Sequence, residues 1–153
     1  FGNGPAIQLS DGTVVWVVGG RFDPSLGHNC IGVLRSTDRA RNFELAAIIK
    51  TDHPMNEPTV AEVAPGHLVM VARREGDVSW SNDGGKTWTH KRCKIGKNGF
   101  SGLQGFGTAV NQDGRLLFIG EPWFTIWRIL PSNPSTLRAN IPIMTKPRWA
   151  TDE

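Results

Sequence analysis

Two short segments of the same form constrain the fold of this chain most. SNDGGKTW (81–88) and STDRARNF (36–43) both read Ser-x-Asp-x-small-x-x-aromatic. The Asp carboxylate of such a turn can accept hydrogen bonds from the backbone N–H groups of its own turn, and glycine allows the positive φ that the turn requires. We expect the aromatic residue that ends each segment to pack as an apolar plug that anchors the turn to a hairpin.

Hairpins of one kind alternate with these turns. The segments 4–21, 57–74 and 105–122 each consist of an apolar run, a turn with glycine and a second apolar run. The turn glycines Gly12, Gly66 and Gly114 recur at about 50 residues, which is the spacing of β-propeller blades. The sequence therefore predicts an all-β fold, a partial β-propeller of four-stranded antiparallel blades.

The predicted strands are short and end at Gly, Pro, Asp or Asn. No segment keeps a helical apolar period over three turns. Six strands are predicted from these runs: Thr13–Gly20, Cys30–Ser36, Phe43–Ile49, His67–Arg73, Arg115–Gly120 and Phe124–Leu130. They group into blades at about 4–50, 57–95 and 105–130. We expect 131–153 to be an extended, proline-rich tail or the start of a further blade.

Composition excludes several classes of function. The net charge is +3, but no run of Lys and Arg is long enough for a nucleic-acid tract. No apolar run reaches the roughly 18 residues of a membrane-spanning helix. Cys30 and Cys93 fit no metal motif, and either one disulfide or two buried thiols is compatible with them. We expect no metal and no cofactor.

The turns resemble the Asp-box, or BNR, repeat, whose pattern is S-x-D-x-G-x-T-W. The second segment matches every defined position, whereas the first is a degraded copy in which Ala40 and Asn42 depart from the pattern. The chain is thus similar to the sialidase superfamily of six-bladed propellers, most of all to its exo-sialidase-like branch. The matching residues are Ser81, Asp83, Gly85, Thr87 and Trp88, with Ser36, Asp38 and Phe43 in the degraded copy.

That resemblance implies a fold, a location and an activity. A ring of six blades needs about 300 residues, so this chain of 153 would supply about three blades, completed by further blades or by another chain. The resemblance implies an extracellular or cell-surface glycoside hydrolase that acts on terminal, anionic sugars of glycans. The alternative is a non-catalytic BNR-repeat propeller that binds glycan or protein.

Two residues are predicted to meet at the rim opposite the Asp boxes. Glu57 begins a strand and Arg73 ends its antiparallel partner, so both lie at one end of the pair. From the resemblance, Glu57 is a catalytic carboxylate that tunes a nucleophile or base, and Arg73 binds the sugar carboxylate through its forked donors. An exposed salt bridge between them, of little energetic value, is the alternative.

The loop 21–29 is predicted to contact substrate because it is longer than the equivalent loop of the next hairpin. The resemblance implies that Arg21 is a second cation for the sugar and that Asp23 is the acid/base carboxylate, a role that His28 could take instead. Two features depart from the family. Asn3 or Gly4 stands where an Arg is expected, and the chain contains no Tyr, the family's usual nucleophile. The nucleophile therefore lies outside this chain, water attacks directly, or the protein hydrolyses nothing.

Overall fold

Strands make up most of the described chain. The computed structural model describes the backbone of residues 4–73, 77–92, 108–112, 115–120 and 123–128, and the side chains of 4–72 and 77–90. Only one short 3-10 helix, η1 (Pro24–Leu26), interrupts the strands in this part of the chain. The strands are β1 (Ile7–Gln8), β2 (Val14–Gly20), β3 (Cys30–Ser36), β4 (Glu44–Ile49), β5 (Asn56–Ala64), β6 (His67–Arg73), β7 (Asp77–Ser81), β8 (Thr89–Arg92), β9 (Thr108–Gln112), β10 (Arg115–Gly120) and β11 (Trp123–Arg128).

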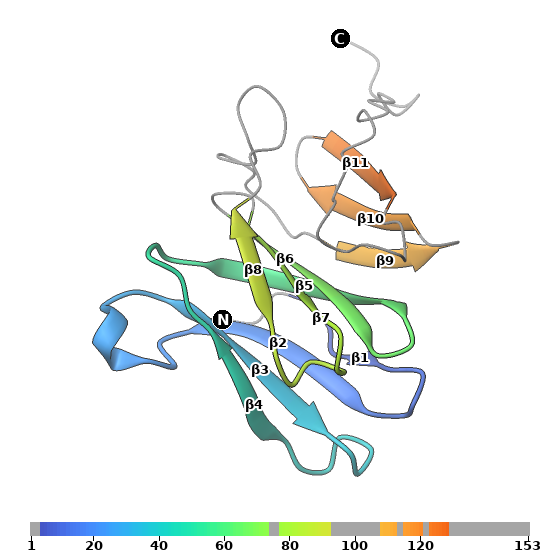
Figure 1. Ribbon diagram of the computed structural model, residues 1–153, viewed down its shortest axis with the longest axis horizontal. Helices are drawn as coiled ribbons and strands as arrows, with labels where there is room; N and C mark the ends of the chain where they lie inside the picture. Colours follow the sequence, from blue (N-terminus) through green and yellow to red (C-terminus); the bar gives the residue numbers. More distant parts are fainter. Residues whose placement is uncertain (1–3, 74–76, 93–107, 113–114, 121–122, 129–153) are drawn as a thin grey trace, which may run out of the picture.

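The strands form three antiparallel sheets in chain order (Figure 1). Two are four-stranded, with the orders β1-β2-β3-β4 and β5-β6-β7-β8, and the third has the order β11-β10-β9. The all-β prediction is confirmed, and the open sheets are consistent with a partial propeller. The predicted tail, 131–153, lies outside the described residues, so the domain boundaries stay predictions. None of the helical structure described here has the length and apolar character needed to cross a bilayer.

Glycine turns set the strand boundaries. Gly12 and Gly66 have φ values of 87° and 73°, a left-handed conformation that glycine adopts without steric cost. Gly114, the third predicted turn glycine, lies outside the described residues. The predicted strands 30–36, 67–73 and 115–120 have the bounds observed for β3, β6 and β10.

The core lies between the first two sheets. Buried and half-buried residues alternate along β2, so that one face of the strand is directed into the core. The cluster of buried apolar side chains draws on both sheets and on the connections that join their strands: Leu9, Val15, Val17, Ile31, Val33, Ile49, Met55, Val60, Leu68, Met70 and Ala72. Cys30 is a buried free thiol, and Cys93 lies outside the described residues.

The two Asp-box turns have the same hydrogen bonds despite their different sequences. In the second turn, Ser81 Oγ donates to Asp83 Oδ1 at 2.7 Å, and the same carboxylate accepts from Lys86 N, Thr87 N and Thr87 Oγ1 at 3.0, 2.9 and 2.6 Å. In the first turn, Ser36 Oγ donates to Asp38 Oδ1, again at 2.7 Å. Arg41 N, Asn42 N and Asn42 Nδ2 then donate to the Asp38 carboxylate at 3.1, 2.9 and 2.7 Å.

These donors keep both carboxylates ionised. The pKa of Asp38 is lowered to about 2, chiefly by the backbone and side chain of Asn42. For Asp83, burial raises the pKa, but the hydrogen bonds from Thr87 and Ser81 outweigh it and lower the pKa to about 2. Asn42 can replace threonine because its amide N–H supplies the same donor as a hydroxyl group.

The aromatic residues of the two turns differ in burial. Trp88 packs against the core, and its Nε1 donates to Gly85 O at 3.0 Å. Phe43 was expected to be a similar plug, but it is 39% exposed and contacts Trp16 edge-on at 6.4 Å between ring centroids. The second turn packs against the preceding sheet, since a Cβ on Gly85 would lie 3.7 Å from Val33 of β3.

Two sets of hydrogen bonds tie the first sheet to the second at the Asp-box end. The buried Arg35 of β3 donates from Nε to Gly84 O at 2.9 Å. The Glu62 carboxylate of β5 accepts from Ser10 N at 2.7 Å and from Ser10 Oγ at 3.0 Å across the two sheets, and from Gly66 N at 2.9 Å within the second sheet. These bonds fix the second sheet on the first through polar contacts in addition to the apolar core.

Ala40→Gly is expected to stabilise the protein by about 0.5–1 kcal/mol. Ala40 has a φ of 63°, and its counterpart in the second turn, Gly85, has a φ of 88°. Glycine removes the steric cost of this left-handed conformation, and this gain exceeds the stability lost because glycine raises the conformational entropy of the unfolded state. The free energy of unfolding in urea, measured on the full-length protein, tests this.

Ala47→Gly in β4 is the matched control, because Ala47 pairs in register with Val33 of β3. The same change in an extended strand is expected to cost about 0.5–1 kcal/mol. A loss of stability in both variants would contradict the conformational argument.

Candidate functional site

The start of β5 brings Glu57 to the position predicted for it. Asn56 of β5 pairs with Arg73 of β6, and the register shifts between Asn56 and Thr59, so that Glu57 lies in an irregularity next to the end of β6. The Arg73 side chain lies outside what the structure describes. The backbone positions of Glu57 and Arg73 are therefore close, at the end of the sheet opposite the Asp boxes.

Glu57 has an unusual backbone conformation. Its φ is 47°, a left-handed value that costs a residue with a side chain about 1 kcal/mol or more. The residue is half-buried, and its Oε2 atom is shielded from solvent. Strained backbone of this kind is concentrated at functional sites, where the surrounding structure enforces it. The conformation thus holds a shielded carboxylate at the rim of the sheet.

The loop 21–29 reaches the same rim. Asn29 Nδ2 donates to Asn56 Oδ1 at 2.8 Å, and Met55 N donates to Asn29 O at 3.1 Å. His28, half-buried, lies beside this junction with Nδ1 at 3.1 Å from Asn29 O. The end of the loop is thus attached next to Glu57, and no local sequence pattern indicates the Asn29–Asn56 contact.

Asp23 makes contacts that stabilise its own loop. Its carboxylate accepts from Ser25 N at 3.0 Å and Ser25 Oγ at 2.6 Å at the start of η1, and it forms a salt bridge with Lys50 Nζ at 2.6 Å. Lys50, followed by Ser25, lowers the pKa of Asp23 to about 2. A general acid must hold its proton near the working pH. The acid/base role of Asp23 stays a prediction that these contacts do not favour, and Arg21 beside it is exposed.

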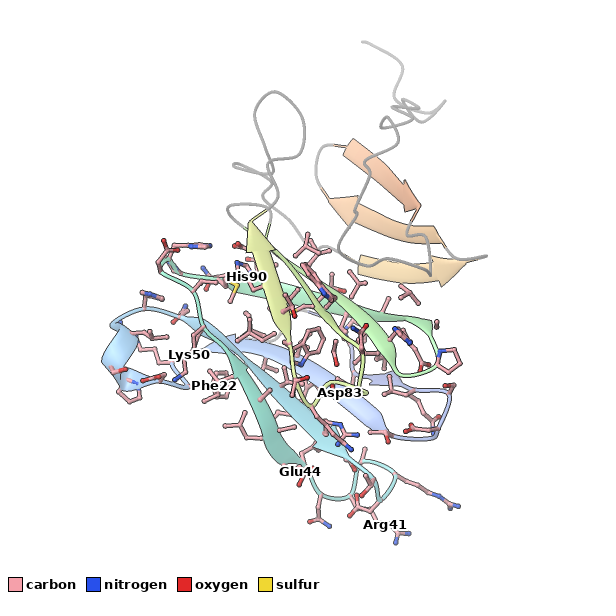
Figure 2. All side chains as sticks on the ribbon, viewed as in Figure 1. Phe22, Arg41, Glu44, Lys50, Asp83 and His90 are labelled. Atoms are coloured by element: carbon pink, nitrogen blue, oxygen red, sulfur yellow. The ribbon has the colours of Figure 1, made fainter. Side chains whose placement is uncertain are left out.

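Phe22 holds the loop against the first sheet. Its ring lies over two glycines: a Cβ on Gly20 would be 3.1 Å from the ring, and a Cβ on Gly32 would be 2.6 Å from it. Figure 2 shows Phe22 beside Lys50, at the base of the loop. The glycines of β2 and β3 therefore create the space in which this aromatic side chain is seated.

A second polar cluster, which was not predicted from the sequence, lies at the same end of the second sheet. Asp77, the first residue of β7, is fully buried and pairs in register with Ala72, the neighbour of Arg73. His53 Nε2 is 3.0 Å from both carboxylate oxygens of Asp77, and His90 Nε2 is 3.3 Å from Oδ1. Figure 2 labels His90 and Asp83 at opposite ends of this sheet, so the cluster is remote from the Asp box.

The two histidines keep Asp77 charged. Burial raises the pKa of Asp77, but the hydrogen bonds and charges of His90 and His53 outweigh it, and the pKa lies below its ordinary value. The three residues are far apart in the sequence and match no spacing rule for a local motif. Only the charged residue that opens an otherwise uncharged strand, Asp77, could have drawn attention to the cluster.

Comparisons with known proteins show a likeness of fold. No protein-family model matches the chain, and no curated protein is significantly similar to it in sequence. A protein of unknown function from Dyadobacter fermentans is 25% identical, with a TM-score of 0.62 over 77% of this chain and 33% of its own. A mutant of the NanB sialidase from Streptococcus pneumoniae is 14% identical, with a TM-score of 0.56 over 85% of this chain and 21% of its own.

The chain thus spans about a third of one of these proteins and about a fifth of the other. At 14% identity, the similarity to NanB concerns the fold alone.

Proposed function

We propose that this chain forms part of a sialidase-like glycoside hydrolase that acts on terminal, anionic sugars of glycans. The observation that carries the proposal is the strained, half-buried Glu57, whose shielded carboxylate lies at the end of β5 next to the backbone of Arg73. The likeness of fold to NanB supports it. An extracellular or cell-surface location belongs to the same proposal.

In this proposal, Glu57 accepts a proton and Arg73 binds the sugar. Glu57 would activate a nucleophile or a water by accepting its proton, since its carboxylate is held at the rim of the sheet. Arg73, and Arg21 from the neighbouring loop, would bind the carboxylate of the sugar through paired N–H donors. His28 lies by the Asn29–Asn56 junction and is a better-placed donor to the leaving group than Asp23, which is occupied by Lys50.

In this proposal, the attacking group is either a residue outside this chain or a water molecule. A retaining sialidase of the usual kind uses a tyrosine, and the chain has none. Glu57 would therefore act on a tyrosine of a further blade or of another chain, or on a water molecule. Hydrolysis should therefore be assayed with the full-length protein.

The contacts of Asp23 favour a second candidate, a non-catalytic propeller that binds glycan or protein. Its salt bridge to Lys50 and its low pKa leave the predicted acid without a proton to donate. Such a protein would keep the rim formed by the loop 21–29 and the start of β5 as a binding surface.

Hydrolysis of a fluorogenic sialoside by the full-length protein tests the proposal. We expect turnover of the sialoside at least about 100-fold faster than turnover of the matching fluorogenic galactoside, which lacks the carboxylate. Equal rates on the two substrates would contradict the anionic specificity. No turnover, with retained binding of a non-hydrolysable sialoside, would establish the second candidate in place of the hydrolase.

A further inference from the structure

The His53–Asp77–His90 cluster has the composition of a metal site. Its members come from three elements: the connection before β5, the start of β7 and β8. One ligand atom from each residue lies within 4.8 Å of the other two. Two imidazole nitrogens and one carboxylate are a common ligand set for zinc and other first-row transition metals.

The two distances from Asp77 to the imidazoles suit ligands of a single ion. Zinc binds nitrogen and oxygen at about 2.0–2.2 Å, so neighbouring ligands in a tetrahedron are about 3.3 Å apart. The separations from the Asp77 carboxylate are 3.0 Å to His53 Nε2 and 3.3 Å to His90 Nε2. The three ligand atoms all lie within 4.8 Å of one another, so the two imidazoles would have to approach each other by up to about 1.5 Å for all three side chains to hold one ion.

The contacts of the two imidazoles on the side away from Asp77 also favour metal binding. His53 Nδ1 is 2.6 Å from Asp52 Oδ1, and His90 Nδ1 is 3.1 Å from Ser79 Oγ. Metal-binding histidines usually have the second ring nitrogen bonded to a carboxylate or another polar group, which fixes the ring and its tautomer. Both rings thus have Nδ1 bonded to an outer partner and Nε2 directed at Asp77.

We propose that His53, Asp77 and His90 bind one zinc ion, with a fourth position open to water or to a ligand. The site is independent of the proposed hydrolase, since none of its three residues has a role there. The ion would join the connection before β5 to β7 and β8. It would thereby fix the segment that leads into Glu57.

This proposal departs from the expectation of a chain without metal, which rested on the spacing of the cysteines. The ligands are supplied by strands and by the connection between two sheets, so no short sequence pattern contains them. The fully buried Asp77, with an imidazole on each side, is the structural feature that reveals the site.

Titration of the metal-free, full-length protein with zinc chloride tests the proposal. We expect one zinc per chain by calorimetry, a higher unfolding temperature with zinc, and the visible absorption of four-coordinate cobalt when Co²⁺ replaces it. His53→Gln and His90→Gln keep a hydrogen-bond donor for Asp77 but ligate zinc poorly, and each is expected to weaken zinc binding at least about 100-fold. Ser79→Ala, which removes an outer partner only, is expected to weaken it about 10-fold.

His67→Ala is the matched control, because His67 bonds Asn82 at the other end of the second sheet. It is expected to bind zinc like the wild type. Failure of the wild-type protein to bind zinc would overturn the proposal, as would equal affinities in His53→Gln and His67→Ala. Neither result would bear on sialoside hydrolysis, so the two proposals fail separately.

Discussion

The Glu57→Gln variant of the full-length protein is expected to hydrolyse a sialoside with a kcat/KM at least about 100-fold below that of the wild type. Glutamine has nearly the same shape as glutamate but cannot accept the proton of a nucleophile or water. The half-buried position and the φ of 47° should hold the amide where the carboxylate lies. Initial rates over a range of sialoside concentrations, with a melting curve for each protein, measure the effect.

Glu62→Gln is the matched control on the same strand. Glu62 lies near the other end of β5, where its carboxylate binds Ser10 and the backbone of Gly66. Its change to glutamine is expected to lower the melting temperature and to leave kcat/KM near the wild-type value. Unchanged hydrolysis by Glu57→Gln, or an equal loss in both variants, would exclude a specific catalytic role for Glu57.

Gly32→Val is expected to destabilise the protein by about 2 kcal/mol. A Cβ at this position would lie 2.6 Å from Cζ of Phe22 and 2.7 Å from two further ring atoms, which is closer than non-bonded carbons can approach. The ring must then leave its place over β2 and β3, and the loop 21–29 must move with it. Urea unfolding monitored by tryptophan fluorescence gives the free energy.

A double-mutant cycle separates this contact from a general intolerance of valine. Phe22→Ala removes the obstructing ring, so Gly32→Val should cost less in that background than in the wild type. If valine cost the same with and without the ring, the contact with Phe22 would not be its cause.

Much of the fold follows from local rules in the sequence. Gly12 and Gly66 end strands because they adopt φ values that other residues avoid, so the hairpins were predictable. The degraded Asp box also forms the full set of hydrogen bonds, because the turn requires a donor at Asn42 and not threonine itself. In both cases, the local sequence was sufficient to predict the turn.

The errors and omissions arise where distant segments meet. Lys50 follows β4, and nothing near Asp23 in the sequence indicates their salt bridge. Phe43 matches the pattern of Trp88, but only the second turn has a preceding sheet to pack against in the part of the chain that the structure describes. The His53–Asp77–His90 cluster is likewise assembled by tertiary structure alone.

The candidate site at Glu57 could be predicted from the sequence only in part. The end-to-end pairing of β5 and β6 was predictable from the hairpin, and it places Glu57 beside the backbone of Arg73. The positive φ of Glu57 was not predictable, because the residue before a proline normally prefers an extended conformation. The attachment of the loop 21–29 at Asn56 depends on one side-chain contact that has no sequence signature.

The bond from Arg35 to Gly84 has a consequence for how the protein is made. Arg35 belongs to the first sheet and Gly84 to the Asp box of the second, so the later turn is completed by a side chain that the ribosome has already released. Chains are synthesised from the N-terminus, and early segments can fold before later ones emerge. The first sheet can then act as the template on which the second is assembled, which limits the time that the apolar face of the second sheet is exposed to solvent.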